Sequence, residues 1–329
     1  MNIAYRFRIY PTEEQKIFLG KTFGCCRFLY NQMLNDKIQE YEKTKKMLKN
    51  TPAMYKKEYP FLKEVDSLAL ANVQLHLEKA YKNFFREPKI GFPRFKSKHH
   101  SRNSYTTNVV NGNILVESKK IRLPKLKWIA MKKHREPAEG LRLKSVTVSM
   151  EPSGKYFASL LYEGYSCENQ AAESDYSTAK ILGIDYAMQG MAVFSEEVET
   201  EEAGFFRKNE KRLVREQRKL SRCVRGSHNY ELQKKKVARC HEKIRNQRRD
   251  YLHKLSRKIV DSYDAVAVED IDMKAMGQCL HFGKSVHDNG YGMFREMLDY
   301  KLAWKGKKIV KVDRFFPSSK KCCQCGRIK

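Results

Sequence analysis

The stretch from Lys180 to Ser195, KILGIDYAMQGMAVFS, decides the fold of this chain. It reads as an apolar strand that carries one carboxylate, Asp185, then a turn at Gln189-Gly190 and a second strand from Met191 to Phe194. Burying a lone carboxylate is costly unless it is paired, hydrogen-bonded or bound to a cation. Asp185 therefore points to a site within the strand framework.

A second acidic residue ends another short apolar run further along the chain. Ala265 to Val268, within DAVAVEDIDMKAM, form this run, and Glu269 follows it. Two strands that each bring a carboxylate to one centre resemble an RNase H-like fold, in which acids from separate strands hold Mg²⁺ for phosphodiester cleavage. The sequence therefore predicts an α/β domain with Asp185 and Glu269 at its centre.

The composition indicates a polyanion as the partner. The chain has 329 residues, of which 66 are Lys or Arg and 38 are Asp or Glu, and its formal net charge is +28. Because 18 Tyr and 17 Phe accompany the basic residues, nucleic acid is favoured over a membrane surface. A ribosomal or merely basic soluble protein stays open on composition alone.

The sequence contains neither a long apolar run nor a signal peptide pattern. We therefore expect a cytoplasmic, nucleoid-associated bacterial protein with no membrane partner. Its cysteines are expected to be reduced there, so that only their clustering is informative. The nine cysteines are at positions 25, 26, 167, 223, 240, 279, 322, 323 and 325.

The N-terminal part predicts a strand followed by two helices. Residues 3–9 alternate apolar and mostly polar side chains, which is typical of a half-buried strand with a basic outer face. Thr12 and Gln15 form a capping-box pattern that begins the first helix, and Asp66 introduces a second helix over residues 67–85. The charged residues 43–57 between them are expected to be a loop or frayed helix.

After residue 88 the pattern changes to loops and strands. The segment GFPRFKSKHHSRNSYTT, residues 91–107, mixes basic side chains with aromatics, which suits a backbone groove with stacking platforms. An ordinary strand and loop with solvated charges is the alternative. KSVTVSM and KYFASLLYE, joined around Ser153-Gly154, predict a β-hairpin, and the strands on either side of the helices are expected to close a small β-barrel.

A polar linker over residues 167–178 is predicted before the strand pair that contains Asp185. Residues 206–258 then hold 20 Lys and Arg against 5 Asp and Glu, and break near Gly226-Ser227. This pattern predicts a basic helical hairpin that contacts a duplex backbone, although a solvated face is the alternative. Its narrow apolar stripe comprises Leu213, Leu220, Leu232, Val237, Leu252 and Leu255.

Eight segments carry a resemblance to a known family. They are, in chain order, YRFRIYPTEEQ, FGCCRFLYNQML, YPFLKEVDSLALANVQLHLEKAYKNFF, GFPRFKSKHHSRNSYTT, QRKLSR, HEKIRNQRRDYLHKLSR, VEDIDMKAM and FFPSSKKCCQCG. Together they resemble the transposon-encoded TnpB family, the OrfB-type proteins related to type V CRISPR effectors. The resemblance implies an RNA-guided DNA-binding protein whose partners are a guide RNA and a double-stranded DNA target with a short adjacent motif, with one protein per guide RNA.

The resemblance also implies a domain organisation. It comprises a wedge-type β-barrel (1–10 and 88–166), an inserted helical recognition lobe (11–87), and, after the linker, a RuvC-like domain (179–329). The last domain contains the basic hairpin (206–258) and the start of a zinc ribbon (320–329). Asp185 stands where the family has its first catalytic Asp, and Glu269 where it has its catalytic Glu.

This sequence departs from the family pattern at two places. Ala187 stands where the family usually has Gly, and the sequence ends four residues after Cys325, before a second Cys pair and the third catalytic carboxylate. A zinc site needs four ligands, so Cys322 and Cys325 are expected to form an unoccupied half site. At most one weakly bound Mg²⁺ is expected.

Other acidic residues do not replace the missing carboxylate. Asp270 and Asp272 follow Glu269 too closely to approach a metal from the opposite side, and they are interpreted as a turn and a helix cap. Asp313 falls in a segment that matches an ordinary strand of the family. The centre formed by Asp185 and Glu269 is therefore expected to be incomplete.

The resemblance, together with the incomplete centre, thus implies an RNA-guided DNA-binding protein, and we infer that such a protein represses transcription by occupying its target. The alternatives are an RNA-guided DNA endonuclease of a transposon, if this sequence is a piece of a longer chain, and an unguided structural protein that binds nucleic acid. The predicted nucleic-acid contacts are Arg6, Arg8, Gln74, Lys79, Lys82, Asn83, Arg94, Lys96, Lys98, Arg102, Tyr105, Arg215, Arg218, Lys219, Arg222, Arg245, Arg248 and Arg249. Recognition of the adjacent motif is expected on the first strand and the helical lobe.

Overall fold

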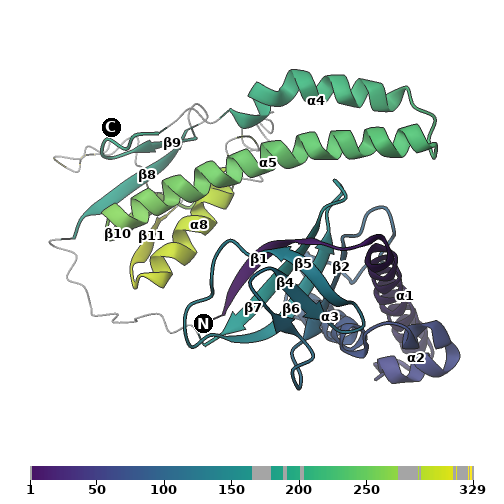
Figure 1. Cartoon of the computed structure of the whole chain (residues 1–329). Helices are drawn as coiled ribbons and strands as arrows, with labels where there is room; N and C mark the ends of the chain where they lie inside the picture. The colour runs from purple at the N-terminus through teal and green to yellow at the C-terminus, as the bar shows by residue number, and fades with distance from the viewer. Residues whose placement is uncertain are drawn as a thin grey trace. The chain divides into compact units, whose positions relative to one another are not determined.

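The computed structural model describes residues 2–164, 179–187, 191–200, 204–272, 288, 290–313, 316, 325 and 327. The chain divides into two units, Met1–Tyr165 and Ser166–Lys329, and most of their elements are labelled in Figure 1. The predicted linker, residues 167–178, lies outside the described residues. Among the described helices, none is both long enough and apolar enough to span a membrane.

The first unit is built on a seven-stranded antiparallel sheet. Its strands are β1 (Ile3–Tyr10), β2 (Asn103–Asn108), β3 (Leu115–Val116), β4 (Lys120–Leu123), β5 (Lys127–Lys132), β6 (Arg142–Met150) and β7 (Tyr156–Glu163). Their order is β2-β6-β7-β1-β5-β4-β3. The predicted alternation of β1 is confirmed, because Phe7 and Ile9 are fully buried. The predicted β6–β7 hairpin is also confirmed, and Gly154 closes its turn with a positive φ of 81° and a 2.9 Å hydrogen bond to the carbonyl of Glu151.

Helices are inserted between β1 and β2. They are α1 (Glu13–Thr44), α2 (Pro52–Glu58), the short 3-10 helix η1 (Pro60–Lys63), α3 (Ser67–Arg86) and the 3-10 helix η2 (Pro88–Ile90). The capping box is confirmed, since the Thr12 hydroxyl accepts from the Gln15 N–H at 3.3 Å and the Gln15 side chain accepts from the Thr12 N–H at 3.0 Å. The predicted N-cap of α3 is confirmed too, because Asp66 accepts a 3.0 Å hydrogen bond from the N–H of Leu68.

The expectation of a loop or frayed helix over residues 43–57 is wrong in its second half. Thr51 and Pro52 begin α2 there, with proline at the first helical turn where its missing N–H costs nothing. The α2 side chain Tyr55 is buried, and its hydroxyl donates a 2.6 Å hydrogen bond to Asp36 of α1. The buried Tyr55 ring and its hydrogen bond stabilise a helix that the charged residues around it did not indicate.

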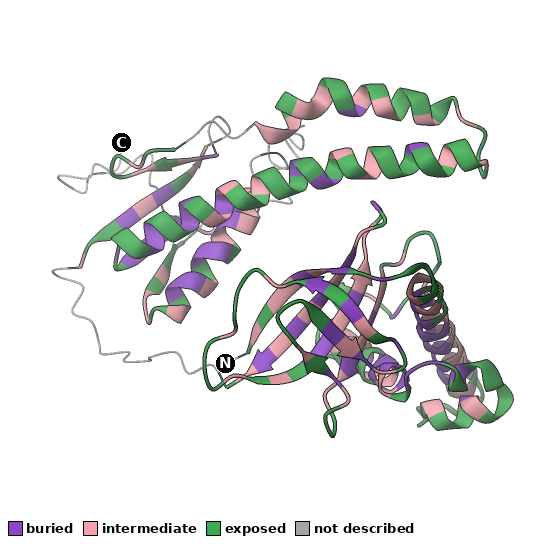
Figure 2. Cartoon of the chain, in the orientation of Figure 1, coloured by how far each residue is buried: buried purple, intermediate pink, exposed green. Residues whose placement is uncertain are grey.

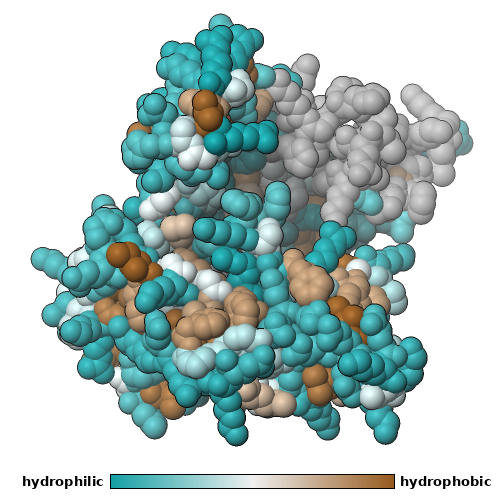
Figure 3. Space-filling view, turned by 90° about the vertical axis from the view of Figure 1, so that its right-hand side faces the viewer, coloured by the Kyte–Doolittle hydropathy of each residue, from teal (hydrophilic) through white to brown (hydrophobic). Residues whose placement is uncertain are grey.

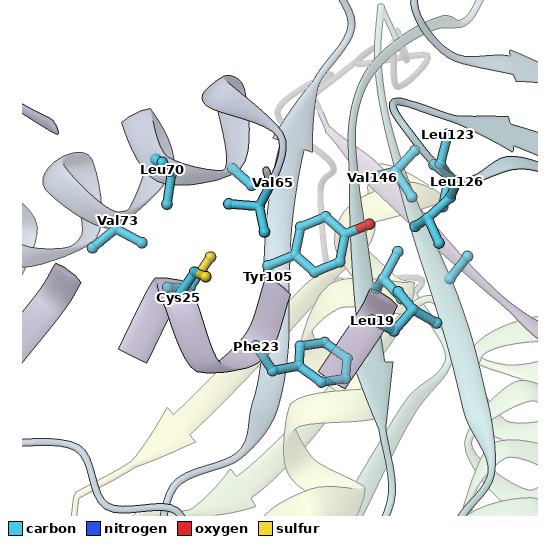
Figure 4. Close-up of a cluster of buried hydrophobic side chains, with 14 of the residues drawn as sticks. Leu19, Phe23, Cys25, Val65, Leu70, Val73, Tyr105, Leu123, Leu126 and Val146 are labelled. Carbon is cyan, nitrogen blue, oxygen red and sulfur yellow. The ribbon is translucent and has the colours of Figure 1, made fainter. Parts of the chain in front are cut away.

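A single core joins these helices to the sheet. Leu19 and Phe23 of α1 and Val65 before α3 pack with Tyr105 of β2 and Val146 of β6 (Figure 4). The rings of Phe23 and Tyr105 have their centroids 6.0 Å apart. The first unit therefore holds its helices rigidly against the strands, which fixes the positions of the loops that leave them.

The second unit has a four-stranded sheet of mixed direction. Its strands are β8 (Ile181–Ala187), β9 (Met191–Phe194), β10 (Ala265–Glu269) and β11 (Lys308–Val312), in the order β11-β10-β8-β9. β8, β10 and β11 are parallel, whereas β8 and β9 are antiparallel. The predicted strand pair around Asp185 and the predicted strand before Glu269 are confirmed.

Helices connect these strands and cover the sheet. They are α4 (Phe205–Ser221), α5 (His228–Ser262) and α8 (Tyr291–Trp304). Leu182 and Val266 of the sheet share one buried cluster with Leu252 of α5 and Phe294 of α8. The fold is therefore α/β, as predicted, with the helix-covered face of this sheet forming the second core.

Candidate functional site

The two predicted carboxylates lie on adjacent parallel strands at the same level. The register pairs Val266 with Leu182 and Val268 with Ile184, so Asp185 and Glu269 each come one residue after a paired position. Successive side chains on a strand point to opposite faces, and the four paired residues belong to the helix-covered core. Asp185 and Glu269 therefore share the other face of the sheet.

The side chains of Asp185 and Glu269 contact each other through a hydrogen bond. Burial raises the pKa of Glu269 above its usual value, and the hydrogen bond and negative charge of Asp185 raise it further. A carboxylate of Asp185 also accepts a 2.8 Å hydrogen bond from the N–H of Tyr186. Two like charges that converge in this way share one proton, or hold one cation in its place.

The donor set fits one hard divalent cation. Mg²⁺ is commonly bound by one or two carboxylates with water completing its shell, and Asp185 and Glu269 supply such a pair. Within the described ranges, no group of three or more His, Cys, Asp or Glu side chains could hold a metal ion. Cys325 is a free, exposed cysteine, while Cys322 lies outside the described residues.

The neighbouring acids differ from the pair in their contacts. Asp270 accepts a 3.3 Å hydrogen bond from Arg295 of α8, and its N–H donates to the carbonyl of Val312 in β11. Asp313 directly follows β11 and is exposed, as is Asp272. The helix that Asp272 was expected to cap falls on residues outside the described part of the chain.

Tyr291, at the start of α8, lies in the helix-covered core and interacts electrostatically with the acidic pair, which the sequence did not indicate. Its ring is almost fully buried and packs edge-on against Tyr186 with centroids 5.1 Å apart. Burial raises its pKa to about 12; the positive charge of Arg295 opposes this rise, and the negative charges of Asp185 and Glu269 add to it. Among the described residues, its buried hydroxyl has no hydrogen-bond partner.

Gly290 is the N-cap of α8, which begins at Tyr291. Gly290 has a positive φ of 68°, and a Cβ at this position would lie 2.9 Å from the Cδ of Arg248. Glycine adopts this conformation without steric cost and leaves space for the arginine. In the sequence Tyr291 follows a glycine, a residue that marks a helix end in many sequences.

The basic hairpin predicted for residues 206–258 is formed by α4 and α5. Ser227 caps α5 by accepting a 3.1 Å hydrogen bond from the N–H of Tyr230, which confirms the break near Gly226-Ser227. Leu213 and Ile244 are buried along it. Gln233 of α5 donates to the carbonyl and the side chain of Glu216 in α4 at 3.0 and 2.8 Å.

Most of this hairpin is exposed (Figure 2). Leu232, predicted to belong to the apolar stripe, is 44% exposed, so the stripe is shorter than expected because polar contacts replace it toward the turn. Six of the predicted contacts are exposed, namely Arg215, Arg218, Lys219, Arg222, Arg245 and Arg249. These side chains lie at the solvent-exposed surface of the two helices.

Arg248 does not fit the predicted nucleic-acid contact. Its guanidinium donates a 3.3 Å hydrogen bond to the buried Asp288, which also accepts from the N–H groups of Phe206 and Arg207 at 2.8 and 3.3 Å. If Arg248 moved away to bind nucleic acid, the buried carboxylate of Asp288 would lose its positive partner. Arg248 therefore ties α5 to the start of α4 instead of presenting its charge to solvent.

The predicted contacts of the first unit, apart from the buried Tyr105, fall into two groups. Those on the surface are Lys79, Lys82, Arg94, Lys98 and Arg102, while Arg6, Arg8, Gln74, Asn83 and Lys96 are half-buried. Arg6 pairs with Glu151 at 2.5 Å and lies 3.9 Å from the Phe157 ring centroid; the Arg8 guanidinium is 5.2 Å from the same ring. These two arginines stack along the outer face of the sheet.

Two predictions for residues 91–107 are corrected by burial. Tyr105 lies in the core beside Phe23, where burial raises the pKa of its hydroxyl, so it has no free face for stacking (Figure 4). Lys96 places its ammonium 3.8 Å from the Tyr30 ring centroid, and burial lowers its pKa. The sequence could not show which of the alternating side chains turn inward.

Three family models match this chain. A probable transposase model, OrfB_IS605, matches residues 164–279; a helix-turn-helix domain model of the same family matches residues 1–46; and a Cas12f1-like TNB domain model matches residues 291–329. In the structure, residues 1–46 contain β1 and the single long helix α1. The matches follow the order of the segments quoted from the sequence.

Similar proteins agree with these models. A protein of Streptomyces pristinaespiralis, named as an RNA-guided DNA endonuclease, is 33% identical over 99% of this chain and 81% of its own length. The Escherichia coli protein InsQ, named likewise, is 30% identical over 98% of this chain and 83% of its own length.

A solved structure shares the fold. The Cas12f1 protein, in its complex with sgRNA and target DNA, matches with a TM-score of 0.57 and 12% identity over 100% of this chain and 92% of its own. Together with the relatives that match along almost the whole sequence, this likeness leads to one conclusion. The chain belongs to the transposon-encoded TnpB family of OrfB-type proteins.

Proposed function

We propose that this protein binds DNA at sites selected by an RNA guide and represses transcription by occupying them. The observation that carries the proposal is the α4–α5 hairpin, whose exposed arginines and lysines face solvent along two long helices. The relatives named as RNA-guided DNA endonucleases, and the sgRNA and target DNA in the Cas12f1 complex, support a guide and a DNA target as the two ligands.

In this proposal the two units have different roles. The strands of the first unit serve as a wedge-type β-barrel with an inserted helical recognition lobe, residues 11–87, and the first strand and this lobe read the short motif beside the target. The second unit serves as a RuvC-like domain whose hairpin follows the duplex backbone. One protein binds one guide RNA, and base pairing between guide and target supplies the sequence specificity.

The hairpin would contribute affinity through phosphate contacts. Its excess of 20 basic over 5 acidic residues supplies more positive charge than solubility requires. Each phosphate that a lysine or arginine neutralises releases condensed counterions, so the affinity falls steeply with salt. Arg248 is left out of this set, because it holds the hairpin together through Asp288.

Asp185 and Glu269 would hold one Mg²⁺ in this proposal. A bound Mg²⁺ would polarise a phosphodiester oxygen and so favour attack of water at the phosphorus, with the opposite P–O bond breaking. In-line displacement across two ions needs carboxylates on several sides of the site, whereas Asp185 and Glu269 approach from one face and contact each other. We therefore propose that the pair binds a cation without supporting cleavage at a useful rate.

The test is to incubate the guide-loaded protein with a matched duplex in Mg²⁺ or Mn²⁺ and to follow both DNA retention and strand integrity. We expect a stable complex with intact strands, and silencing of a reporter whose promoter carries the target. Asp185→Ala should behave as the wild type in retention and silencing, because affinity comes from base pairing and backbone contacts.

Two results would contradict this proposal in different ways. Specific nicking by the wild type that disappears in Asp185→Ala would show an RNA-guided endonuclease. Retention of DNA that is equally strong without guide RNA and without sequence preference would show an unguided nucleic-acid-binding protein.

A further inference from the structure

Three phenylalanines at the end of α3 and after it expose their rings to solvent. Phe85, Phe92 and Phe95, here called the aromatic platform, are 65%, 45% and 56% exposed. Exposed patches of large apolar side chains on a soluble protein often mark interaction sites. In the space-filling view of Figure 3, hydrophobic side chains likewise appear as separate patches on a mainly hydrophilic face.

Other aromatic rings fix two members of the platform. Phe84 contacts Phe85 and Phe92 with centroids 5.4 Å from each, and its ring is nearly perpendicular to that of Phe92 at 83°. Tyr81, which is buried, contacts Phe85 at 6.2 Å and Phe92 at 5.5 Å. Phe85 and Phe92 therefore rest on the buried Tyr81 and the half-buried Phe84, while much of each ring stays exposed to solvent.

The segment that carries Phe95 is clamped to α1. The side chain of Asn31 donates to the carbonyl of Lys96 at 2.8 Å and accepts from the N–H of Lys96 at 2.7 Å. Gly91, with a positive φ of 84°, turns the chain toward this clamp. A platform held in this way loses little conformational freedom when a ligand binds, which favours affinity.

The charge around the platform is strongly positive. Residues 79–102 contain eight basic residues and one acid, Glu87. The basic residues are Lys79, Lys82, Arg86, Lys89, Arg94, Lys96, Lys98 and Arg102. Lys96 turns inward toward Tyr30, whereas the other seven are exposed. Within the described ranges, none of these seven forms an ion pair with a carboxylate. Exposed aromatic rings among unpaired cations complement a chain of bases and phosphates better than an apolar or a basic protein surface.

We propose that the aromatic platform stacks on unpaired bases of the bound RNA while the surrounding lysines and arginines contact its phosphates. Bases of a DNA duplex are enclosed in the stack, whereas RNA is recognised largely through single-stranded loops and ends whose bases stack on aromatic side chains. The proposal rests on the proposed function and names the surface of the first unit that holds the guide.

The test measures binding of the 329-residue protein to a fluorescently labelled, single-stranded oligouridylate of about 12 nucleotides. Fluorescence anisotropy of the wild type is compared with that of Phe85→Ala, Phe95→Ala and the matched control Phe61→Ala, which removes a 42% exposed phenylalanine elsewhere on the same unit. A single-stranded DNA of the same length and a duplex RNA are measured in parallel. Thermal unfolding followed by circular dichroism checks that each variant folds as the wild type does.

We expect Phe85→Ala and Phe95→Ala each to weaken binding of the single-stranded RNA by roughly five-fold to one hundred-fold. The slope of affinity against salt should stay unchanged, because no phosphate contact is lost, whereas Lys89→Ala should reduce that slope by about 0.7. Trp in place of Phe85 should restore binding, since any large aromatic ring offers a stacking face. Phe61→Ala and binding of duplex RNA should be unaffected.

Wild-type affinity in Phe85→Ala and Phe95→Ala would overturn the proposal, as would equal losses for single-stranded and duplex RNA. Tighter binding of the single-stranded DNA, with the same sensitivity to both variants, would assign the platform to a DNA strand and overturn its assignment to RNA. If the wild type binds no RNA probe at all, the proposed function fails together with this inference. If the wild type binds RNA and only the variants fail to differ, the inference alone is wrong.

Discussion

Replacing Glu269 by Gln is expected to stabilise the second unit at neutral pH in buffer without divalent cations. In the folded protein, burial and the neighbouring Asp185 raise the pKa of Glu269 above its ordinary value of 4.5. The folded state therefore binds this proton more tightly than the unfolded chain does. Its contribution to stability is complete below the unfolded pKa and is lost as the pH rises through the folded pKa.

The magnitude follows from two negative charges in contact. At about 4 Å, two unit charges repel by ~1 kcal/mol in bulk water and by ~4 kcal/mol at the effective dielectric of a protein surface. Asp185 is exposed, so solvent screens the repulsion and the lower figure applies. We expect Glu269→Gln to raise the free energy of unfolding by about 1 kcal/mol at neutral pH and by almost nothing at pH values below 4.5.

Differential scanning calorimetry across this pH range is the assay. Glu296→Gln, on the exposed side of α8, is the control and should leave the pH profile unchanged. Adding Mg²⁺ should stabilise the wild type more than Glu269→Gln, because a ligand that binds only the folded state stabilises it by mass action. A variant that is less stable than the wild type at neutral pH without Mg²⁺ would refute this reasoning.

Three further perturbations test other parts of the structure. Asp66→Ala removes both the cap of α3 and the partner of the buried Thr107 hydroxyl, so urea unfolding should show a loss of roughly 2–4 kcal/mol, and a loss below ~1 kcal/mol would contradict this. Leu213→Ala should cost ~2–4 kcal/mol, whereas Leu232→Ala should cost less than ~0.5 kcal/mol, and equal losses would contradict the burial difference. Binding of guide and target should fall about a thousandfold or more between roughly 50 and 200 mM salt if about six phosphates are engaged, and a weak salt dependence would count against the basic hairpin.

Local patterns in the sequence predicted the elements that depend on neighbours in the chain. The alternation in β1, the Thr12–Gln15 capping box and the Asp66 cap all rest on residues a few positions apart, and each was found as expected. α2 was missed because it depends on the buried Tyr55 and its hydrogen bond to Asp36, which no local pattern encodes.

The candidate site was predictable only in part, for a related reason. Two acids that end apolar runs suggested a common centre, and the parallel register of β8 and β10 does bring Asp185 and Glu269 together. The electrostatic interaction of Tyr291 with them could not be predicted, since it depends on how α8 packs on the sheet. Arg248 was assigned to nucleic acid because composition counts charges and does not show which of them already has a partner.

The register of β8 and β10 makes the site more sensitive to strand length than to side-chain identity. Inserting one residue between Ala265 and Glu269 would reverse the side on which the glutamate emerges and direct it toward the cluster of Leu252 and Phe294. Exchanging one aliphatic side chain for another of similar size, as in Val268→Ile, would leave the carboxylate where it is. Substitutions in this strand can therefore change its packing without moving the carboxylate. An insertion or deletion of one residue, in contrast, would separate the two acids.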